Sequence, residues 1–192
     1  ANGGYNLRPM PIHKKLKKIL SEKKIKHEIL SHKTVYTAFD LAQTLGKKLT
    51  EVAKTLALKV DKRYVLVVLP ASHRADLKKL AKLLKVKKID IIRETEMSKV
   101  FKVKPGAIVP FGTFHGVPVY LDKALLKSKV IIASAGTFSE SLKLKTKDLL
   151  LAGAEKIESF SKLHKFSTPK KGKKKTKKTN KDKKVAKKKA KK

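Results

Sequence analysis

Two apolar runs that follow each other closely constrain the fold of this chain more than any other feature. Residues 54–60 and 64–69 are rich in Leu and Val, and only Asp61, Lys62 and Arg63 separate them. Short runs of this kind, joined by a few polar residues, are typical of two strands in a β-hairpin. We therefore expect an antiparallel pair of strands near the middle of the chain.

Helical and strand-like patterns alternate around this hairpin. Apolar residues at helical spacing, with a cap at Thr37 and a stop at Gly46, predict helices over residues 11–24, 38–45, 76–85, 94–101 and 147–152. Further strands are predicted over residues 26–30, 88–92, 117–121, 130–135 and 141–144. The order lacks the regular rhythm of a doubly wound fold, so we expect an α/β domain with a mixed sheet.

Charge divides the chain into a folded part and a tail. The 192 residues include 46 Lys and 4 Arg against 15 acidic residues, a net charge of +35. Residues 168–192 hold 15 Lys and one Asp, which leaves +21 on residues 1–167. The tail has too few apolar residues to fold alone. We expect a flexible segment over 1–10, one domain over 11–155, a linker over 156–167 and a disordered Lys-rich tail over 168–192.

This excess of lysine points to a polyanionic partner, because lysine binds phosphate as a compact charge and arginine is the residue that reads guanine edges. We expect a polyanion held through its phosphates without recognition of bases, with RNA as one candidate ligand of the tail, and a basic tail that serves only solubility or localisation remains the alternative. The chain has no Cys, which excludes disulfides and thiolate sites. No apolar run approaches the roughly 18 residues of a membrane span, so we expect a cytoplasmic protein that does not bind membranes.

One lysine is singled out by the phase of its strand. Alternation places Lys54 on the same face as Leu56, Leu58 and Val60, while Lys59 points the other way. A buried ammonium group is costly unless an anionic or polar group meets it. Lys54 therefore predicts a pocket for a phosphate or a polarised carbonyl. The alternative is that its side chain extends from the start of the strand into solvent.

Two other segments could line such a pocket. Residues 105–112 combine prolines and glycines, which can present backbone amides to an oxyanion, although this pattern is more often a plain turn. Residues 135–139 place hydroxyls at a strand end, where they either hold substrate or cap the next turn. The six His residues are scattered, without metal-binding spacing or a Gly-x-Ser-x-Gly elbow. We expect neither a metal nor another cofactor.

Six segments, taken in order, resemble the YbaK and prolyl-tRNA-synthetase editing-domain family. They are residues 35–38, Ala42 with residues 45–46, residues 52–56, residues 105–106 with 110–112, residues 117–122, and residues 135–136. Together they span about residues 12–152. An ordered set of this kind is far more specific than any one of its members.

The resemblance implies a trans-acting aminoacyl-tRNA deacylase, with a mostly antiparallel, barrel-like sheet surrounded by helices and a pocket for the aminoacylated 3′ end of tRNA. It implies that Lys54 is catalytic, contacting the terminal phosphate or the ester carbonyl. The substrate-binding residues that it implies are Tyr36, Thr37, Thr55, Gly106, Pro110, Phe111, Gly112, Gly136 and Thr137.

Some members of the family have His or Asn near the position of Thr137, so the choice of amino acid does not carry over. A non-catalytic RNA-binding module with the same fold, or a ribosome-associated protein, is the alternative function, since counterion release alone would give such a chain affinity for RNA.

Overall fold

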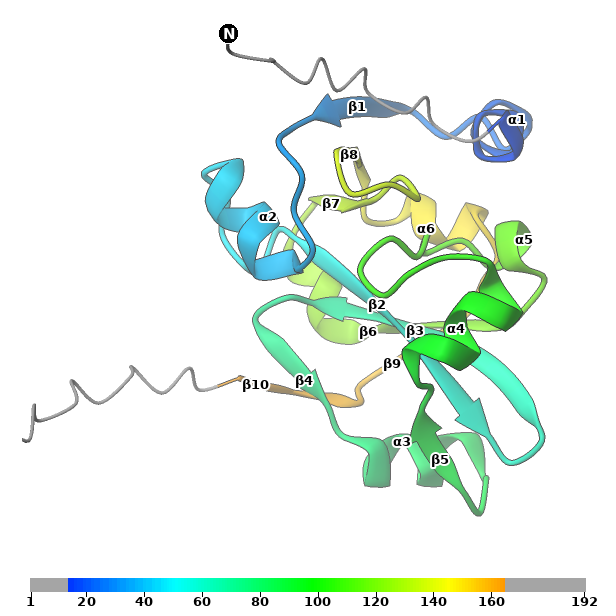
Figure 1. Cartoon of the computed structure of the whole chain (residues 1–192). Helices are drawn as coiled ribbons and strands as arrows, with labels where there is room; N and C mark the ends of the chain where they lie inside the picture. Colours follow the sequence, from blue (N-terminus) through cyan, green and yellow to red (C-terminus); the bar gives the residue numbers. More distant parts are fainter. Residues whose placement is uncertain (1–13, 165–192) are drawn as a thin grey trace, which may run out of the picture.

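The computed structural model describes residues 14–164, so the predicted N-terminal segment 1–10 and the tail 168–192 lie outside the described residues (Figure 1). Its centre is a five-stranded sheet in the order β5-β2-β3-β6-β9. The bounds of these strands are Ala53–Val60 for β2, Arg63–Pro70 for β3, Ile89–Ile91 for β5, Val119–Asp122 for β6 and Ala154–Glu158 for β9.

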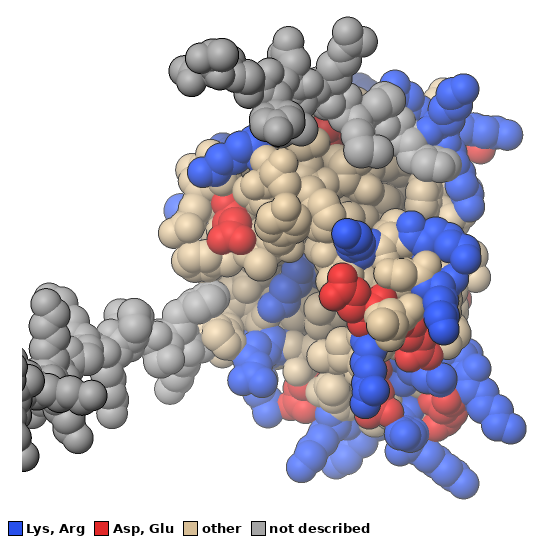
Figure 2. All heavy atoms as spheres, viewed as in Figure 1, with Lys and Arg blue, Asp and Glu red and all other residues tan. Residues whose placement is uncertain are grey.

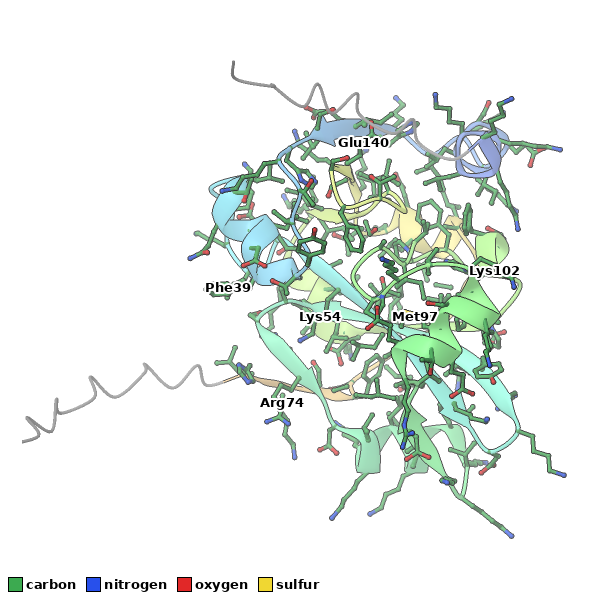
Figure 3. The ribbon with its side chains drawn as sticks, viewed as in Figure 1. Phe39, Lys54, Arg74, Met97, Lys102 and Glu140 are labelled. Atoms are coloured by element: carbon green, nitrogen blue, oxygen red, sulfur yellow. The ribbon has the colours of Figure 1, made fainter. Side chains whose placement is uncertain are left out.

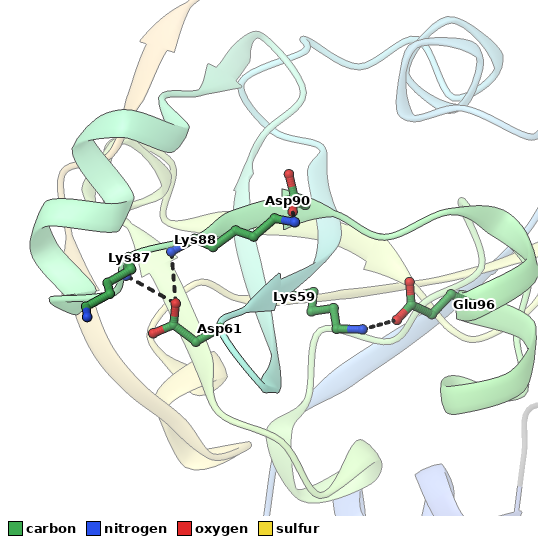
Figure 4. A network of polar contacts seen from close by, with 6 residues as sticks. All are labelled: Lys59, Asp61, Lys87, Lys88, Asp90 and Glu96. Carbon is green, nitrogen blue, oxygen red and sulfur yellow. Dashed lines mark hydrogen bonds and ion pairs between the residues drawn. The ribbon is translucent and has the colours of Figure 1, made fainter.

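The predicted hairpin is confirmed by the antiparallel pairing of β2 and β3, in which Lys54 faces Leu69 and Val60 faces Arg63. The turn is tighter than predicted, because only Asp61 and Lys62 lie between the strands. Asp61 has a positive φ of 49°, and its Oδ1 accepts hydrogen bonds from the N–H groups of Lys87 and Lys88 (Figure 4). These bonds tie the turn to the segment that leads into β5.

Both faces of β3 are buried, which explains its nearly continuous apolar sequence. Leu66 and Val68 belong to the main core, whereas Val65 and Val67 belong to a second core with Leu80. Leu80 comes from α3 (Leu77–Leu84), which begins one residue later than predicted because the Asp76 side chain caps it by accepting from the N–H of Lys79. The central hairpin therefore lies between two hydrophobic cores, with packed side chains on both of its faces.

A second sheet has the order β1-β8-β7, with bounds His27–Ser31, Glu140–Lys145 and Val130–Ser134. It meets the central sheet at a bridge between Val52 and Ile132, where the N–H of Ile132 donates to the carbonyl of Glu51 at 2.8 Å. A third sheet pairs β4 (His73–Ala75) with β10 (Ser161–Leu163).

The prediction of a mixed, mostly antiparallel sheet is confirmed: within residues 14–164, five of the seven strand pairings are antiparallel. The sheets do not close into a barrel, because β5 and β9 end the central sheet while β1 and β7 end the second one. The predicted barrel-like sheet is therefore an open arrangement and not a closed barrel. The single bridge at Val52 is too short to continue a hydrogen-bonded ladder from one sheet to the other.

Helices surround these sheets (Figure 1). Besides α3, they are α1 (Lys14–Glu22), α2 (Ala38–Thr44), α4 (Glu94–Phe101), α5 (Gly112–His115), α6 (Asp148–Leu151) and the 3₁₀ turn η1 (Lys123–Lys127). Thr37 caps α2 as predicted, since its hydroxyl accepts from the N–H of Asp40. Of the described residues, none lies in a helix long and apolar enough to cross a membrane.

The described structure continues past the predicted domain boundary at residue 155. β9 pairs in parallel with β6, and β10 pairs antiparallel with β4, so residues 156–163 are not a free linker. Between them, Phe160 is fully buried and its N–H donates to the carboxylate of Asp122 at 2.8 Å. Sequence patterns missed β4, α5, η1, β9 and β10 because each is short and is held by a partner far away in the chain.

Charged side chains are spread unevenly over the described surface. Residues 14–164 contain 33 Lys and Arg against 14 Asp and Glu. Figure 2 shows Lys and Arg crowded at the end of the molecule that carries α3 and β5, whereas the upper middle of the same face is mainly uncharged. The less charged region lies toward α2, where the candidate site is found.

Candidate active site

A pocket of about 200 Å³ lies where the start of β2, the N-terminal end of α2 and the facing ends of β7 and β8 meet. Its wall combines apolar side chains with hydroxyl, imidazole and ammonium groups. The lining residues are His32, Val35, Tyr36, Thr37, Ala38, Leu41, Ala53, Lys54, Thr55, Leu56, Gly106, Ile108, Ser134, Thr137 and Ser141. Of the site residues predicted from the sequence, the pocket brings together Tyr36, Thr37, Lys54, Thr55, Gly106 and Thr137.

Lys54 is the only Lys, Arg, Asp or Glu residue among those that line this pocket. Its strand neighbours Leu58 and Val60, on the same face, are fully buried, and Lys54 itself is partly buried. Among the described residues, Lys54 has no hydrogen bond and no ion pair. Burial lowers the pKa of the Lys54 ammonium group, and the nearby Arg74 guanidinium lowers it further. The fold thus holds a cation without a counter-ion at the wall of a pocket.

Arg74 is a second cation near Lys54 that the sequence analysis missed. It lies exposed on β4, directly after the segment that links this strand to β3. Figure 3 shows Arg74 and Lys54 on the same side of the molecule, below α2. Two like charges close together favour an anionic ligand, since the Arg74 guanidinium destabilises the charged form of Lys54 and a bound anion would offset this effect.

The glycine loop contributes to the pocket through Gly106 and Ile108. Gly106 has a φ of +89°, and a Cβ at this position would lie 2.4 Å from the carbonyl oxygen of Tyr36. Only glycine allows this approach, which fixes the loop against the segment that precedes α2. Among the described residues, the N–H groups of Gly106 and Ile108 have no hydrogen-bond acceptor. Both residues line the pocket; Gly106 is exposed, whereas Ile108 is buried.

The other end of the loop does not reach the pocket. Pro110, Phe111 and Gly112 are buried and are absent from its lining. Phe111 is fully buried in the main core, and a Cβ on Gly112 would lie 2.6 Å from the carbonyl oxygen of Gly153. The structure therefore gives these three residues a packing role at the start of α5.

Residues 135–139, which follow β7, mainly cap the turn between β7 and β8. This capping role is the alternative to substrate binding that the sequence offers for them. The Thr137 hydroxyl accepts from the N–H of Glu140 at 3.0 Å, and the N–H of Gly136 donates to the Ser134 hydroxyl at 3.1 Å. Gly136 does not line the pocket, and Thr137 lines it from within this turn. The resemblance-based role of Gly136 in substrate binding has no geometric support.

His32 and Ser141 form a polar pair at the pocket wall that the sequence analysis did not identify. The two side chains are 109 residues apart in sequence, and His32 Nε2 lies 3.0 Å from Ser141 Oγ. The other ring nitrogen, Nδ1, lies 2.8 Å from the carbonyl oxygen of Lys33 and must donate to it. In the neutral ring Nε2 is therefore an acceptor, so the Ser141 hydroxyl donates to His32. No local pattern could have revealed this pairing.

Comparison with known proteins identifies the family. The sequence model of the aminoacyl-tRNA editing domain matches residues 32–151, which include every residue of the pocket. The chain belongs to the aminoacyl-tRNA editing domain family. The resemblance noted in the six sequence segments is thereby confirmed. This editing domain contains no group of three or more His, Asp or Glu residues placed to hold a metal ion within residues 14–164.

Two curated relatives of the editing domain carry names from tRNA editing. The chain is 27% identical over 136 residues to "Prolyl-tRNA editing protein ProX" of Acetoanaerobium sticklandii, an alignment that covers 68% of this chain and 83% of ProX. It is 29% identical over 115 residues to "Putative Cys-tRNA(Pro)/Cys-tRNA(Cys) deacylase EbsC" of Enterococcus faecalis, covering 59% of this chain and 70% of EbsC.

A solved structure supports the fold of the editing domain. The "Crystal structure of a putative trans-editing enzyme for prolyl tRNA synthetase" matches with a TM-score of 0.68 at 24% identity. The match covers 81% of this chain and 99% of that chain. The mixed α/β architecture is thus shared over nearly the whole length of the solved protein.

Proposed function

We propose that this chain is a trans-acting deacylase, which hydrolyses the ester bond between a wrongly attached amino acid and its tRNA. The observation that carries the proposal is the uncompensated Lys54 ammonium group in a pocket of an editing domain. Deacylase and editing activities are named for the relatives ProX and EbsC. We expect the protein to act in the cytoplasm, because its proposed substrate is aminoacyl-tRNA.

The pocket suits a small aminoacyl group. A volume of about 200 Å³ corresponds to about seven water molecules, since each water occupies roughly 30 Å³ of the liquid. Val35, Leu41 and Ile108 offer apolar contacts to the amino-acid side chain. The remainder of the tRNA must lie outside, where Arg74 and the excess of lysine meet its phosphates.

An aminoacyl ester is already activated, so the protein needs to position it and to stabilise the negative charge that develops on the carbonyl oxygen. We assign this charge stabilisation to Lys54 together with the free N–H groups of Gly106 and Ile108. A preorganised donor of this kind contributes about 10² to 10³ in kcat. Neither group changes its protonation state during the reaction.

We propose that the Ser141 hydroxyl positions the attacking water and accepts its proton. As the water oxygen bonds to the ester carbon, its proton passes to Ser141 Oγ while the Ser141 proton passes to His32 Nε2. The proton returns to the ribose oxygen when the ester bond breaks. We expect Ser141→Ala to lower kcat about tenfold or more, with little change in KM. An unchanged kcat would show that a group other than Ser141 accepts the proton of the attacking water.

The activity is tested by incubating the full chain with Ala-, Ser- and Cys-tRNA and following the loss of the ester. We expect accelerated hydrolysis of at least one of the three. If none is hydrolysed while the protein still binds tRNA, the chain is an RNA-binding module with an editing fold. The strongly basic composition is the observation that favours that second function.

A further inference from the structure

A second cavity, of about 300 Å³, lies beside the first and shares part of its wall. It is formed by the segment before α2 and by the outer side of that helix, with Lys33, Asp40, Gln43 and Thr44 around it. Tyr36 lines both cavities. A ligand in the first cavity therefore lies close to Tyr36.

The ring of Tyr36 is fixed in position but remains open to solvent. Its centroid lies 4.9 Å from that of Phe138 with a tilt of 58°, and its carbonyl oxygen is covered by Gly106. Even so, 65% of Tyr36 is exposed, the largest exposed fraction of any aromatic residue in the part of the chain that the structure describes. A held and exposed ring beside a pocket is the arrangement on which nucleobases stack.

The polar groups of the second cavity fit the edge of a base better than a phosphate. The Gln43 carboxamide offers one acceptor and two donors, and it makes no hydrogen bond with another described residue. The Asp40 carboxylate, whose Oδ2 accepts from the Thr37 hydroxyl at 2.7 Å, offsets the charge of the Lys33 ammonium group in the same cavity, so this cavity offers a phosphate no net positive charge. Phosphates are instead attracted to the uncompensated cations Lys54 and Arg74 near the first cavity.

We infer that the second cavity binds the terminal nucleobase of the tRNA 3′ end, stacked on Tyr36 with its edge toward Gln43. The inference rests on the proposed function. If the ester lies in the first cavity, the ribose that carries the ester and the base of the same nucleotide lie close to Tyr36. The Tyr36 ring then separates the aminoacyl group from the base. The stacked base in turn positions the ribose that carries the ester.

Base stacking can be measured without ester hydrolysis. The probe is an uncharged acceptor-stem hairpin that carries 2-aminopurine in place of the terminal adenine, since the fluorescence of this base falls when it stacks. We expect the full chain and Tyr36→Phe to quench the probe, and Tyr36→Leu to bind about tenfold more weakly with little quenching. Phe39→Leu is the matched control, because Phe39 is an exposed aromatic residue at the same end of α2 that lines neither cavity.

Equal quenching and equal affinity for Tyr36→Leu and the wild type would overturn the inference. In the deacylation assay, Tyr36→Leu should raise KM about tenfold on intact substrate and have no further effect on substrate with an abasic terminal nucleotide. A protein that quenches the probe but hydrolyses no ester contradicts the proposed function alone. A protein that hydrolyses the ester equally well with Tyr36 or Leu contradicts the base site alone.

Discussion

Lys54 and Lys59 lie five residues apart on β2 and have opposite surroundings. Lys59 Nζ lies 3.1 Å from Glu96 Oε1 (Figure 4). The Tyr64 hydroxyl also donates to Glu96 Oε1, at 2.6 Å. The hydrogen bond with Glu96 raises the pKa of Lys59, whereas burial lowers the pKa of Lys54. A surface lysine with a counter-ion needs no ligand, while a partly buried lysine without one gains stability when an anion binds.

Gly106 should be far less tolerant of substitution than Gly46. Both have positive φ, but a Cβ on Gly106 would collide with the Tyr36 carbonyl, whereas a Cβ on Gly46 would meet open space. We expect Gly106→Ala to lower kcat/KM about tenfold or more, because the loop or Tyr36 must move. Gly46→Ala should cost about 1 to 2 kcal/mol of stability from strain and leave kcat/KM unchanged. Similar kinetics for the two variants would contradict the assigned role of the loop.

His115 should make the domain sensitive to acid. Burial lowers its pKa to about 4, although the ring hydrogen-bonds the Val109 carbonyl and packs edge-on against Phe101. The unfolded chain takes up a proton near pH 6.5, which the folded protein accepts only near pH 4. The free energy of unfolding therefore falls as pH drops through this window, by about 3 kcal/mol from this residue.

Urea unfolding at pH 7, 5.5 and 4.5 measures this loss of stability, with His115→Gln as the control. The variant keeps a donor for Val109 but has no ionisable ring, so its stability should depend less on pH. His73, whose pKa burial also lowers, remains in both proteins. An identical pH dependence for wild type and variant would show that His115 does not contribute.

At this scale, strand alternation was sufficient to single out Lys54, because its phase follows from neighbouring residues alone. Arg74, His32 and Ser141 could not be found in this way. Their functional positions depend on how β4, the segment before α2 and the start of β8 are brought together in space. Pro110, Phe111 and Gly112 resemble the family motif, yet the local sequence does not show which end of their loop faces the pocket.

Among the elements, β9 and β10 decide where the domain ends. A chain that ends at residue 155 loses Phe160, most of β9 and the partner of β4, whereas a chain that ends at residue 164 keeps them. Loss of a fully buried Phe side chain alone costs about 3 to 5 kcal/mol. We expect the shorter chain to unfold about 10 °C lower or more, and the longer chain to match the full protein. Equal melting temperatures would favour the boundary at 155.

Elements with strong local signals were predicted, and elements held only by distant partners were not. The β2–β3 hairpin and the capped helix α2 follow from alternation, turn residues and Thr37. β10 has three residues, and its antiparallel partner β4 is almost 90 positions away, so neither has a pattern of its own. The open arrangement of the sheets likewise depends on how the strands of different segments meet, which no single segment encodes.

On the scale of the whole molecule, charge and chemistry are separated. The pocket contains Lys54 as its single Lys, Arg, Asp or Glu side chain, whereas most of the positive charge is spread over the described surface and over residues 168–192. Spread positive charge supplies affinity for phosphates without selecting a sequence. On our proposal, selection of the substrate then depends on the small pocket and on Tyr36.

Deletion of residues 168–192 should therefore weaken binding and leave the chemistry unchanged. This change removes a charge of +14. We expect KM for aminoacyl-tRNA to rise and its dependence on salt concentration to flatten, with little change in kcat, because the lost contacts act on substrate and transition state alike. Steady-state kinetics over a range of salt concentrations measures both. An unchanged salt dependence would show that the tail serves another purpose.

The central claim is that the uncompensated Lys54 stabilises the negative charge that develops on the ester carbonyl oxygen during hydrolysis. Its most direct test is single-turnover deacylation of the preferred aminoacyl-tRNA by the wild type, Lys54→Ala and Lys59→Ala, with folding checked by circular dichroism. We expect Lys54→Ala to slow hydrolysis about 100-fold or more. Lys59→Ala, which removes an equal charge from the same strand, should stay within about twofold of the wild type. Equal rates for Lys54→Ala and the wild type, or equal losses in both variants, would contradict the account.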